Sequence, residues 1–277
     1  MHNPWQLAAF ADEASGSLAG QIGAMKRGGV SHLEIRFVDG VNISKIPQAT
    51  AKKIREELDG NGLAVWAIGS PTGKIRLQED FAPHFDEFQH QLELAHILDA
   101  THYRLFSFYG ADDSTAAFDA VCERLSRMIE TASGSGVILC HENEKDIYGD
   151  TAPRCLQLHT ALPALKAVFD PANFLQCGQE TRSAWELLAP YVEYLHIKDC
   201  NRRGEVVPPG MGEGQLPTIL AAYRAQGGYA LTLEPHLSAF VGLAQLENGE
   251  SATKSAYSYK TNDEAFDAAL AALKALL

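Results

Sequence analysis

The sequence predicts one α/β domain, residues 1–277, folded as a single (β/α)8 barrel. Short apolar runs, of the kind that form strands buried on both faces, alternate with amphipathic helical stretches along the chain. The length of 277 residues suits one large barrel, and 46% hydrophobic residues are ample for its core. Four later strands also end in a side chain that can bind a metal, and such barrels place their active sites at the carboxyl ends of their strands.

Eight strand-then-helix units follow one another along the chain. In the first half we expect strands at 7–11, 32–36, 63–69 and 102–107, and helices at 17–27, 47–58, 82–98 and 114–132. Glycines end the first two helices, at Gly28 and Gly29 and again at Gly60 and Gly62. In the second half we expect strands at 137–143, 166–170, 192–196 and 229–234, and helices near 153–162, 182–188, 216–225 and 263–277.

An open, doubly wound sheet is the alternative arrangement of the same elements. The first strand lacks the G-x-G-x-x-G turn typical of that fold, and the ligand candidates follow several strands of the second half. Both observations favour the barrel. The longest irregular stretch, 235–261, follows the last strand and predicts a lid or a subunit contact.

Composition limits the classes of function. A net charge of −12 opposes binding to nucleic acid, so we expect a small-molecule substrate and no nucleic acid partner. No apolar run approaches the roughly 18 residues of a membrane span, and the start lacks a basic, apolar leader, which predicts a cytoplasmic protein with no membrane contact. Five widely spaced cysteines without C-x-x-C predict small buried side chains rather than a zinc or redox site.

Four side chains that can bind a metal occupy the same place in successive units. Glu142 ends an apolar run, and Asp170, His196 and Glu234 end three later ones, at separations of 28, 26 and 38 residues. Each separation is about one strand, one helix and two loops, so a parallel barrel brings all four to one end. Three carboxylates and one imidazole predict a site for one divalent ion, Mn²⁺, Mg²⁺, Co²⁺ or Zn²⁺. A turn aspartate and a core histidine are the alternative readings of Asp170 and His196.

Other candidates surround these four. Lys74, Lys198 and Arg202, together with Arg104, lie at or just after strand ends and could hold substrate hydroxyls or a phosphate, with surface solvation as the alternative. His141 precedes Glu142 at the tip of its strand and is a candidate substrate contact. The glycine-rich stretch 210–214 could wrap a phosphate with backbone N–H groups, but such a loop is a weak signal by itself.

With these motifs in place, the chain resembles the xylose isomerase-like superfamily of sugar isomerases, ketose 3-epimerases, inosose dehydratases and endonuclease IV relatives. The similarity runs over essentially the whole length, through residues 10–14 (FADEA), 33–36 (LEIR), 69–74 (GSPTGK), 141–145 (HENEK), 169–173 (FDPAN), 196–199 (HIKD) and 233–236 (LEPH). The resemblance implies a TIM barrel and a metal-dependent activity on sugars or polyols.

The resemblance also implies roles for individual residues. Glu142, Asp170, His196 and Glu234 correspond to the metal ligands, and Glu142 and Glu234 also to the catalytic acid/base pair of the ketose 3-epimerases. Arg202 falls where those epimerases carry a substrate-binding arginine. At two positions the chain departs from them. Asn173, a candidate substrate contact, stands where they have a histidine, and Tyr148 stands where they have a glutamate.

These residues predict isomerisation or epimerisation of a sugar or sugar phosphate. A carboxylate removes the proton next to a carbonyl, and a divalent cation stabilises the resulting ene-diolate. Loss of water from a polyol, as in inosose dehydratases, is the main alternative. Phosphodiester hydrolysis would need a richer ligand set, and a non-catalytic sugar-binding protein would not need an intact quartet. A homo-oligomer is expected only by analogy with relatives.

Overall fold

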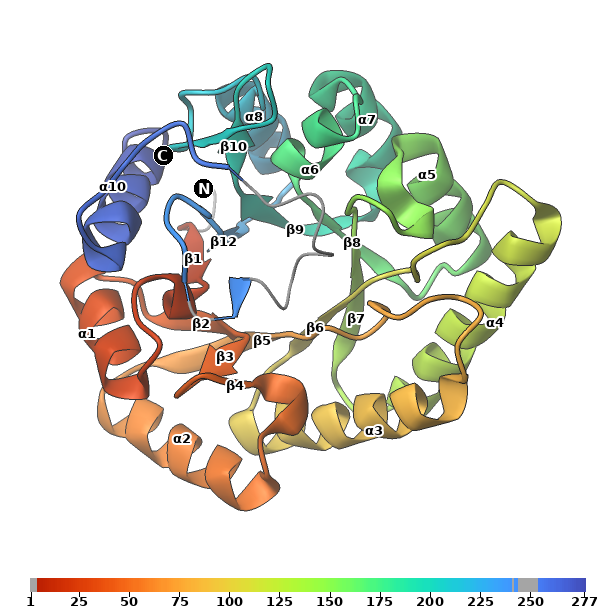
Figure 1. The fold of residues 1–277 in the computed structure, drawn as a ribbon, viewed down its shortest axis with the longest axis horizontal. Helices are drawn as coiled ribbons and strands as arrows, with labels where there is room; N and C mark the ends of the chain where they lie inside the picture. Colours follow the sequence, from red (N-terminus) through yellow and green to blue (C-terminus); the bar gives the residue numbers. More distant parts are fainter. Residues whose placement is uncertain (1–3, 241, 244–253) are drawn as a thin grey trace.

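The computed structural model describes residues 4–240, 242–243 and 254–277, which form a closed barrel of parallel strands surrounded by helices (Figure 1). The strands of the barrel are β1 (Gln6–Ala9), β2 (His32–Ile35), β5 (Ala64–Gly69), β6 (His102–Leu105), β7 (Ile138–Glu142), β8 (Lys166–Phe169), β9 (Val192–Ile197) and β12 (Ala230–Leu233). Around the barrel they follow the order β1, β12, β9, β8, β7, β6, β5, β2, and β2 pairs with β1 to close it. The predicted (β/α)8 barrel is confirmed, and the open-sheet alternative is wrong.

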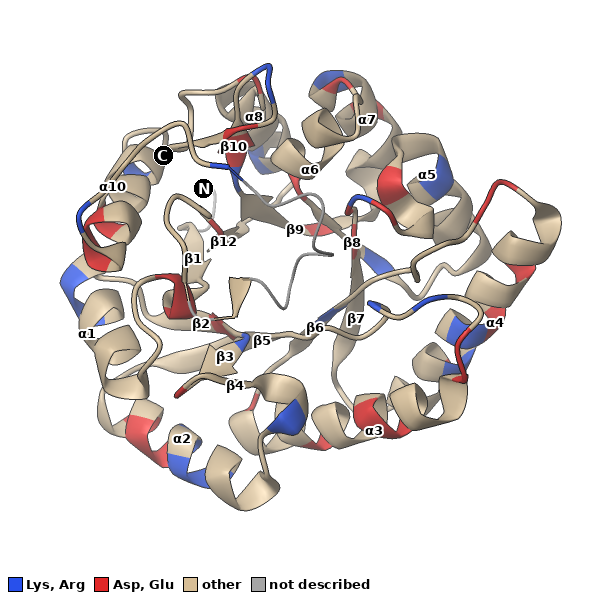
Figure 2. Ribbon diagram, in the orientation of Figure 1, with Lys and Arg blue, Asp and Glu red and all other residues tan. Residues whose placement is uncertain are grey.

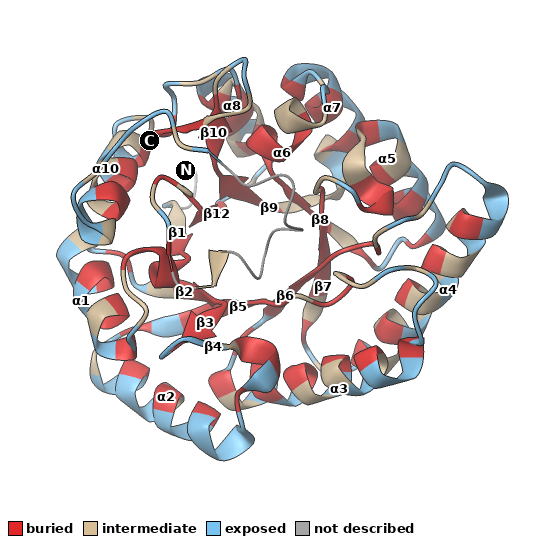
Figure 3. Ribbon diagram, in the orientation of Figure 1, coloured by how far each residue is buried: buried red, intermediate tan, exposed pale blue. Residues whose placement is uncertain are grey.

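The helices form an outer ring around the strands (Figure 1). They are α1 (Leu18–Gly28), α2 (Gln48–Gly60), α3 (Phe81–Leu98), α4 (Thr115–Ala132), α5 (Ala152–Ala161), α6 (Pro171–Gln176), α7 (Thr181–Leu188), α8 (Leu216–Ala225) and α10 (Asn262–Lys274). Hydroxyl side chains cap several of them, because Ser17, Ser114 and Thr261 each accept a hydrogen bond from a backbone N–H of the first turn. Each long helix turns a buried face toward the barrel and an exposed face outward (Figure 3).

Several short elements were not predicted from the sequence. Two hairpins stand beside the barrel, β3 (Phe37–Val38) with β4 (Val41–Asn42) and β10 (Asp199–Cys200) with β11 (Val206–Val207). Short 3-10 helices occur at η1 (Ala11–Glu13), η2 (Ile43–Lys45), η3 (Tyr148–Asp150) and η4 (Ala189–Tyr191). Asp170, for which a turn aspartate was the alternative reading, caps the first turn of α6. Its carboxylate accepts a hydrogen bond from the Asn173 N–H at 2.9 Å.

The lower part of the barrel interior is an apolar cluster. Its buried members are Ala8, Trp66, Ala67, Cys140, Val168, Tyr194 and Ala230. Alternate residues of a strand face the same side. The side chains two residues further along β7, β8 and β9 therefore lie directly above this cluster, at the carboxyl end of the barrel. There the interior changes from apolar to charged.

The glycine-rich stretch 210–214 binds a carboxylate of the chain itself. Asp199 accepts hydrogen bonds from the N–H groups of Gly210 and Gly212 at 3.0 Å and of Gly214 at 2.9 Å. A fourth N–H, that of Cys200, also donates to Asp199, at 2.9 Å. These N–H groups are the ones that could have wrapped a phosphate. The sequence-based suggestion of a phosphate loop is therefore wrong.

The remaining composition-based expectations have mixed outcomes. No described helix combines the length and the apolar character needed to cross a membrane. The five cysteines are free, with Cys140, Cys155 and Cys200 buried and Cys122 and Cys177 partly exposed. Within the irregular stretch 235–261, residues 241 and 244–253 lie outside the described residues, so the lid or subunit contact stays a prediction.

Candidate metal centre

The four predicted metal ligands meet at the carboxyl end of the barrel. Glu142, Asp170, His196 and Glu234 each offer one ligand atom, and these atoms all lie within 4.8 Å of one another. The residues are between 0% and 4% exposed, so their side chains share one buried space. Each stands at or just beyond the end of its strand, and three of them lie two residues after a member of the apolar cluster. The regular alternation of parallel strands thus brings together groups far apart in the sequence.

The geometry fits a single divalent ion. His196 Nδ1 lies 3.0 Å from Glu142 Oε1 and 3.2 Å from Glu234 Oε2. Asp170 Oδ2 is buried and accepts no hydrogen bond from the described residues, although Lys198 Nζ lies 2.8 Å away. Metal bonds of about 2.0–2.3 Å place opposite ligand atoms roughly 4–4.6 Å apart. The spread of these four atoms is close to that, so small side-chain movements would bring them onto one ion.

The imidazole of His196 is held from its far side by Glu34. His196 Nε2 lies 3.1 Å from Glu34 Oε2, and the other oxygen of Glu34 accepts a hydrogen bond from the Tyr194 hydroxyl at 3.0 Å. A carboxylate behind a histidine fixes its tautomer and leaves the other nitrogen for a metal. Burial would lower the pKa of His196, but Glu142, Glu34 and Glu234 outweigh it and raise that pKa well above its ordinary value. A metal ion must therefore displace a proton from Nδ1.

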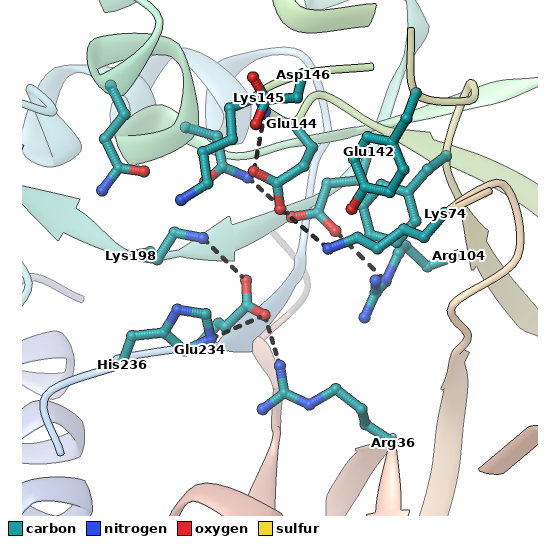
Figure 4. Close-up of a pocket in the computed structure, with 14 residues that line it drawn as sticks. Arg36, Lys74, Arg104, Glu142, Glu144, Lys145, Asp146, Lys198, Glu234 and His236 are labelled. Carbon is teal, nitrogen blue, oxygen red and sulfur yellow. Dashed lines mark hydrogen bonds and ion pairs between the residues drawn. The ribbon is translucent and has the colours of Figure 1, made fainter. Parts of the chain in front are cut away.

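Arg36 holds the carboxylate of Glu234 in the same way. Its guanidinium lies 2.9 Å from Glu234 Oε1 and donates its remaining hydrogen bonds to Asp12, at 2.9 and 3.3 Å, and to Glu13, at 3.2 Å. Arg36 is 1% exposed, so this is a buried cluster of one cation and three carboxylates. Figure 4 shows Arg36 reaching Glu234 from one side and Lys198 from another. Glu234 thereby keeps one oxygen for Arg36 and presents the other to the candidate metal centre.

The carboxylates of the centre differ in acidity. Burial, reinforced by Glu142 and Glu234, raises the pKa of Asp170 to about 7 despite the nearby Lys198. Burial also tends to raise the pKa of Glu234, but Lys198, His196 and His236 lower it well below its ordinary value. Glu13 has a pKa raised to about 8, mainly by burial. A divalent cation at the centre would oppose the effect of burial by favouring the carboxylate form of Asp170.

A pocket of about 530 Å³, counting its opening to solvent, lies over the centre (Figure 4). Four of the candidate substrate-binding residues line it: Lys74, Arg104, Asn173 and Lys198. The Asn173 amide donates hydrogen bonds to Glu142 Oε1 at 3.3 Å and to the Asn143 carbonyl at 2.9 Å. Lys74 pairs with Glu144 at 3.3 Å. Figure 2 shows charged residues inside the ring of helices as well as on the helices themselves.

The structure does not bring His141 and Arg202 to the pocket. His141 is adjacent to Glu142 in β7, so it faces the opposite side of the sheet, where its Nε2 lies 2.9 Å from the Ser107 hydroxyl. The side chain of Arg202 is 86% exposed and pairs with Glu213 at 3.2 Å. Neither side chain is therefore placed to contact a substrate in the pocket. Glu34 and Arg36 were not among the predicted site residues; their signal in the sequence is two charged residues that alternate with the apolar Leu33 and Ile35.

Comparison with known proteins places this geometry in context. A family model described as xylose isomerase-like TIM barrel matches residues 22–261. No curated protein is significantly similar in sequence.

Solved structures resemble the chain over nearly its whole length. D-allulose 3-epimerase from Methylomonas sp., in complex with D-allulose, matches with a TM-score of 0.75 and 17% identity, covering 100% of both chains. The probable 3-DHS dehydratase AsbF from Bacillus anthracis matches with a TM-score of 0.74 and 16% identity, covering 98% of this chain and 99% of that one. A xylose isomerase-like TIM barrel protein from Mycobacterium smegmatis, in complex with magnesium, matches with a TM-score of 0.71 and 16% identity, covering 99% of this chain and 98% of that one. At these identities the likeness concerns the fold.

Proposed function

Because the chain belongs to the xylose isomerase-like TIM barrel family, we propose that it is a divalent-metal-dependent sugar isomerase or epimerase that moves a proton next to a carbonyl. The observation that carries the proposal is the meeting of Glu142, Asp170, His196 and Glu234 at the carboxyl end of the barrel, where Glu142 and Glu234 also line the pocket. These four would hold the metal ion, which is Mn²⁺, Mg²⁺, Co²⁺ or Zn²⁺. When bound, such an ion supplies positive charge that stabilises negative charge developing on substrate oxygens.

Glu142 and Glu234 are the proposed acid/base pair. They come from β7 and from the end of β12, which are separated in the barrel by β8 and β9, so they approach the pocket from different sides. One carboxylate would take the proton from carbon and the other would return it, which gives epimerisation. Return of the proton to the neighbouring carbon gives isomerisation. Asn173 holds Glu142 through its amide, and Lys198 and Arg36 keep Glu234 ionised and oriented.

Substitution of the two carboxylates tests this assignment. We expect Glu142→Gln and Glu234→Gln to reduce deuterium exchange from solvent into substrate by at least about 100-fold, the usual scale of acid/base catalysis. The assay uses Mn²⁺-loaded protein with a panel of ketoses and their acid derivatives, and circular dichroism checks folding. Glu213→Gln, a half-exposed carboxylate away from the pocket lining, is the matched control and should keep full activity. Near-normal exchange in both variants would contradict the assignment.

Elimination of water from a polyol acid or ketone is the second candidate. It uses the same proton abstraction, and it is favoured by two positions at which the chain departs from the ketose 3-epimerases. Asn173 replaces a histidine and is engaged with Glu142, while Tyr148 replaces a glutamate and donates its hydroxyl to Gln157 at 2.6 Å. Mass analysis of the product separates the candidates, because a dehydratase product is lighter by one water. Absence of both bound metal and proton exchange would instead indicate a sugar-binding protein.

The proposal includes a cellular setting. Free cysteines and an acidic composition suit a protein of the cytoplasm that acts on a small molecule. Fractionation of cells that produce the protein tests this placement. Recovery of the protein outside the cytoplasmic fraction would contradict it.

A further inference from the structure

Arg104 is a buried cation on the wall of the pocket, and its Nε is left without a hydrogen bond by the residues that the structure describes. It lies in β6, is 3% exposed and lines the pocket beside the candidate metal centre (Figure 4). Its Nε has no hydrogen-bond partner among the described residues. The nearest carboxylate oxygens to Nε are Glu142 Oε2 at 3.4 Å and Glu34 Oε1 at 3.8 Å.

The surroundings of Arg104 hold its guanidinium in place without satisfying its N–H groups. Phe106 and Phe10 lie 4.6 and 5.5 Å from the guanidinium carbon, measured to the ring centres. Rings at these distances favour a cation but accept few of its hydrogen bonds. Gly69 leaves room for the group, because a Cβ there would lie 3.3 Å from Nη2 of Arg104 and 2.5 Å from the ring of Phe10. The guanidinium is thus held in the wall of the pocket, and no described residue accepts a hydrogen bond from its Nε.

Arg36, on the same pocket, shows the contrast. It is equally buried, yet three carboxylates accept its hydrogen bonds at 2.9–3.3 Å. Arg36 is therefore neutralised within the protein and has a structural task. Among the described residues, the carboxylates near Arg104 are Glu142 and Glu34, at 3.4 and 3.8 Å from Nε, and both of them also face His196.

The proposed metal ion makes the imbalance at Arg104 larger. If Glu142 binds a divalent cation, its charge is shared with that cation and compensates Arg104 less. A buried guanidinium without a counter-charge lowers the free energy of unfolding. An anion from outside the protein would therefore bind favourably at this wall. A second cation lies on the same wall, since Lys74 Nζ is 4.4 Å from the centre of the Phe106 ring that Arg104 also contacts.

We propose that Arg104 binds an anionic group of the substrate, so that the substrate is a hydroxylated acid, with a carboxylate or a phosphate, rather than a neutral sugar. This inference rests on the proposed function, because the metal ion is what takes the charge of Glu142. The planar fork of N–H groups on a guanidinium matches two oxygens of a carboxylate or a phosphate. The floor of the pocket would then bind the reacting oxygens, and the wall at Arg104 would select the acid.

A set of probes built on one carbon skeleton tests the proposal. Calorimetry with the Mn²⁺-loaded protein compares D-fructose with four derivatives, which carry a carboxylate at carbon 1 (2-keto-D-gluconate), a carboxylate at carbon 6 (D-fructuronate), or a phosphate at either end. We expect at least one acid to bind about 10- to 100-fold more tightly than D-fructose, the range for hydrogen bonds to charged groups. The preferred derivative distinguishes carboxylate from phosphate. Equal affinity for D-fructose and all four acids overturns the proposal.

Variants of Arg104 locate the effect. Arg104→Met should remove the preference for the acid while changing the affinity for D-fructose less than about twofold, and Arg104→Lys should keep only part of the preference because it lacks the fork. Lys45→Met, which removes an exposed lysine paired with Glu87, is the control and should bind every probe as the unaltered protein does. An unchanged preference in a folded Arg104→Met protein overturns the proposal. If that variant does not fold, Arg104→Lys decides in its place, and an unchanged preference in a folded Arg104→Lys protein overturns the proposal.

Metal binding is measured separately, so that the two proposals can fail separately. If Mn²⁺ binds and ketoses exchange their protons but acids gain no affinity, the Arg104 proposal fails and the proposed function stands. If no probe exchanges a proton and yet an acid binds through Arg104, the proposed reaction fails and the anion site stands.

Discussion

The barrel interior consists of two layers with opposite chemistry. The lower layer is apolar, with Cys140, Val168 and Tyr194 among its members, and the next residues on the same strand faces are the charged Glu142, Asp170 and His196. Both layers are equally buried, so burial alone does not distinguish them. The lower layer gains stability from excluding water, whereas the upper layer loses stability by holding charges in a poor solvent. The upper layer therefore costs stability, and the apolar layer beneath it offsets that cost.

Removal of Arg36 should have the largest effect on folding. Arg36→Met leaves Asp12, Glu13 and Glu234 buried without their cation, and breaking such a cluster costs about 3–5 kcal/mol of the free energy of unfolding. Urea denaturation at neutral pH measures the loss. Arg27→Met removes an exposed arginine that pairs with Asp263 and Asp267, and it should cost less than about 1 kcal/mol. Similar losses in the two variants would mean that the upper layer does not depend on internal pairing.

Metal ions and pH should act on the upper layer alone. Burial raises the pKa of Asp170 from 3.8 to about 7, so its protonated form stabilises the metal-free fold below pH 4, and that contribution is lost as pH rises through 7. The metal-free protein should therefore lose stability over this window, and Asp170→Asn should lose less. At about 100 times its dissociation constant, Mn²⁺ should add roughly 2.7 kcal/mol to the unaltered protein. A loss with pH that is the same in Asp170→Asn would rule out this role for Asp170.

Shortening a side chain in the lower layer gives the smallest expected change. Val168→Ala should cost about 2 kcal/mol through lost apolar contact and a small cavity. Because Val168 carries no charge, the loss should be the same at pH 5 and pH 8 and with or without Mn²⁺. Thermal or urea unfolding under the four conditions measures it. A loss that varies with metal would show that the two layers are not independent.

The barrel and the meeting of the four candidate ligands could both be predicted from the sequence, and for the same reason. Strand and helix periods are local properties, and the repeated unit fixes where each strand ends. Once Glu142, Asp170, His196 and Glu234 share one place in that unit, parallel topology brings them together without any further information. The short α6 and the hairpins escaped prediction because each spans too few residues to display a period.

The differences between the expected and the observed surroundings of the site concern the face of a strand, the direction of a loop side chain and long-range pairing. His141 and Glu142 are neighbours, and only knowledge of which face looks inward separates a core histidine from a ligand. Arg202 lies in a loop, where no periodicity tells which way a side chain points. Arg36 pairs with Glu234, on a strand from the other end of the chain, so its role becomes visible only when the barrel closes.

The contact between Asp199 and the glycine-rich stretch bears on how such sequences are interpreted. A Cβ at Gly212 would lie 2.3 Å from Asp199 Oδ1 and 2.4 Å from the Cys200 carbonyl, so a glycine is required there by the chain itself. Three alternating glycines resemble the signature of a nucleotide or cofactor cradle, but here an aspartate eleven to fifteen residues earlier satisfies their N–H groups. In other barrels with such a pattern, a carboxylate at that spacing deserves to be looked for before a cofactor is assigned.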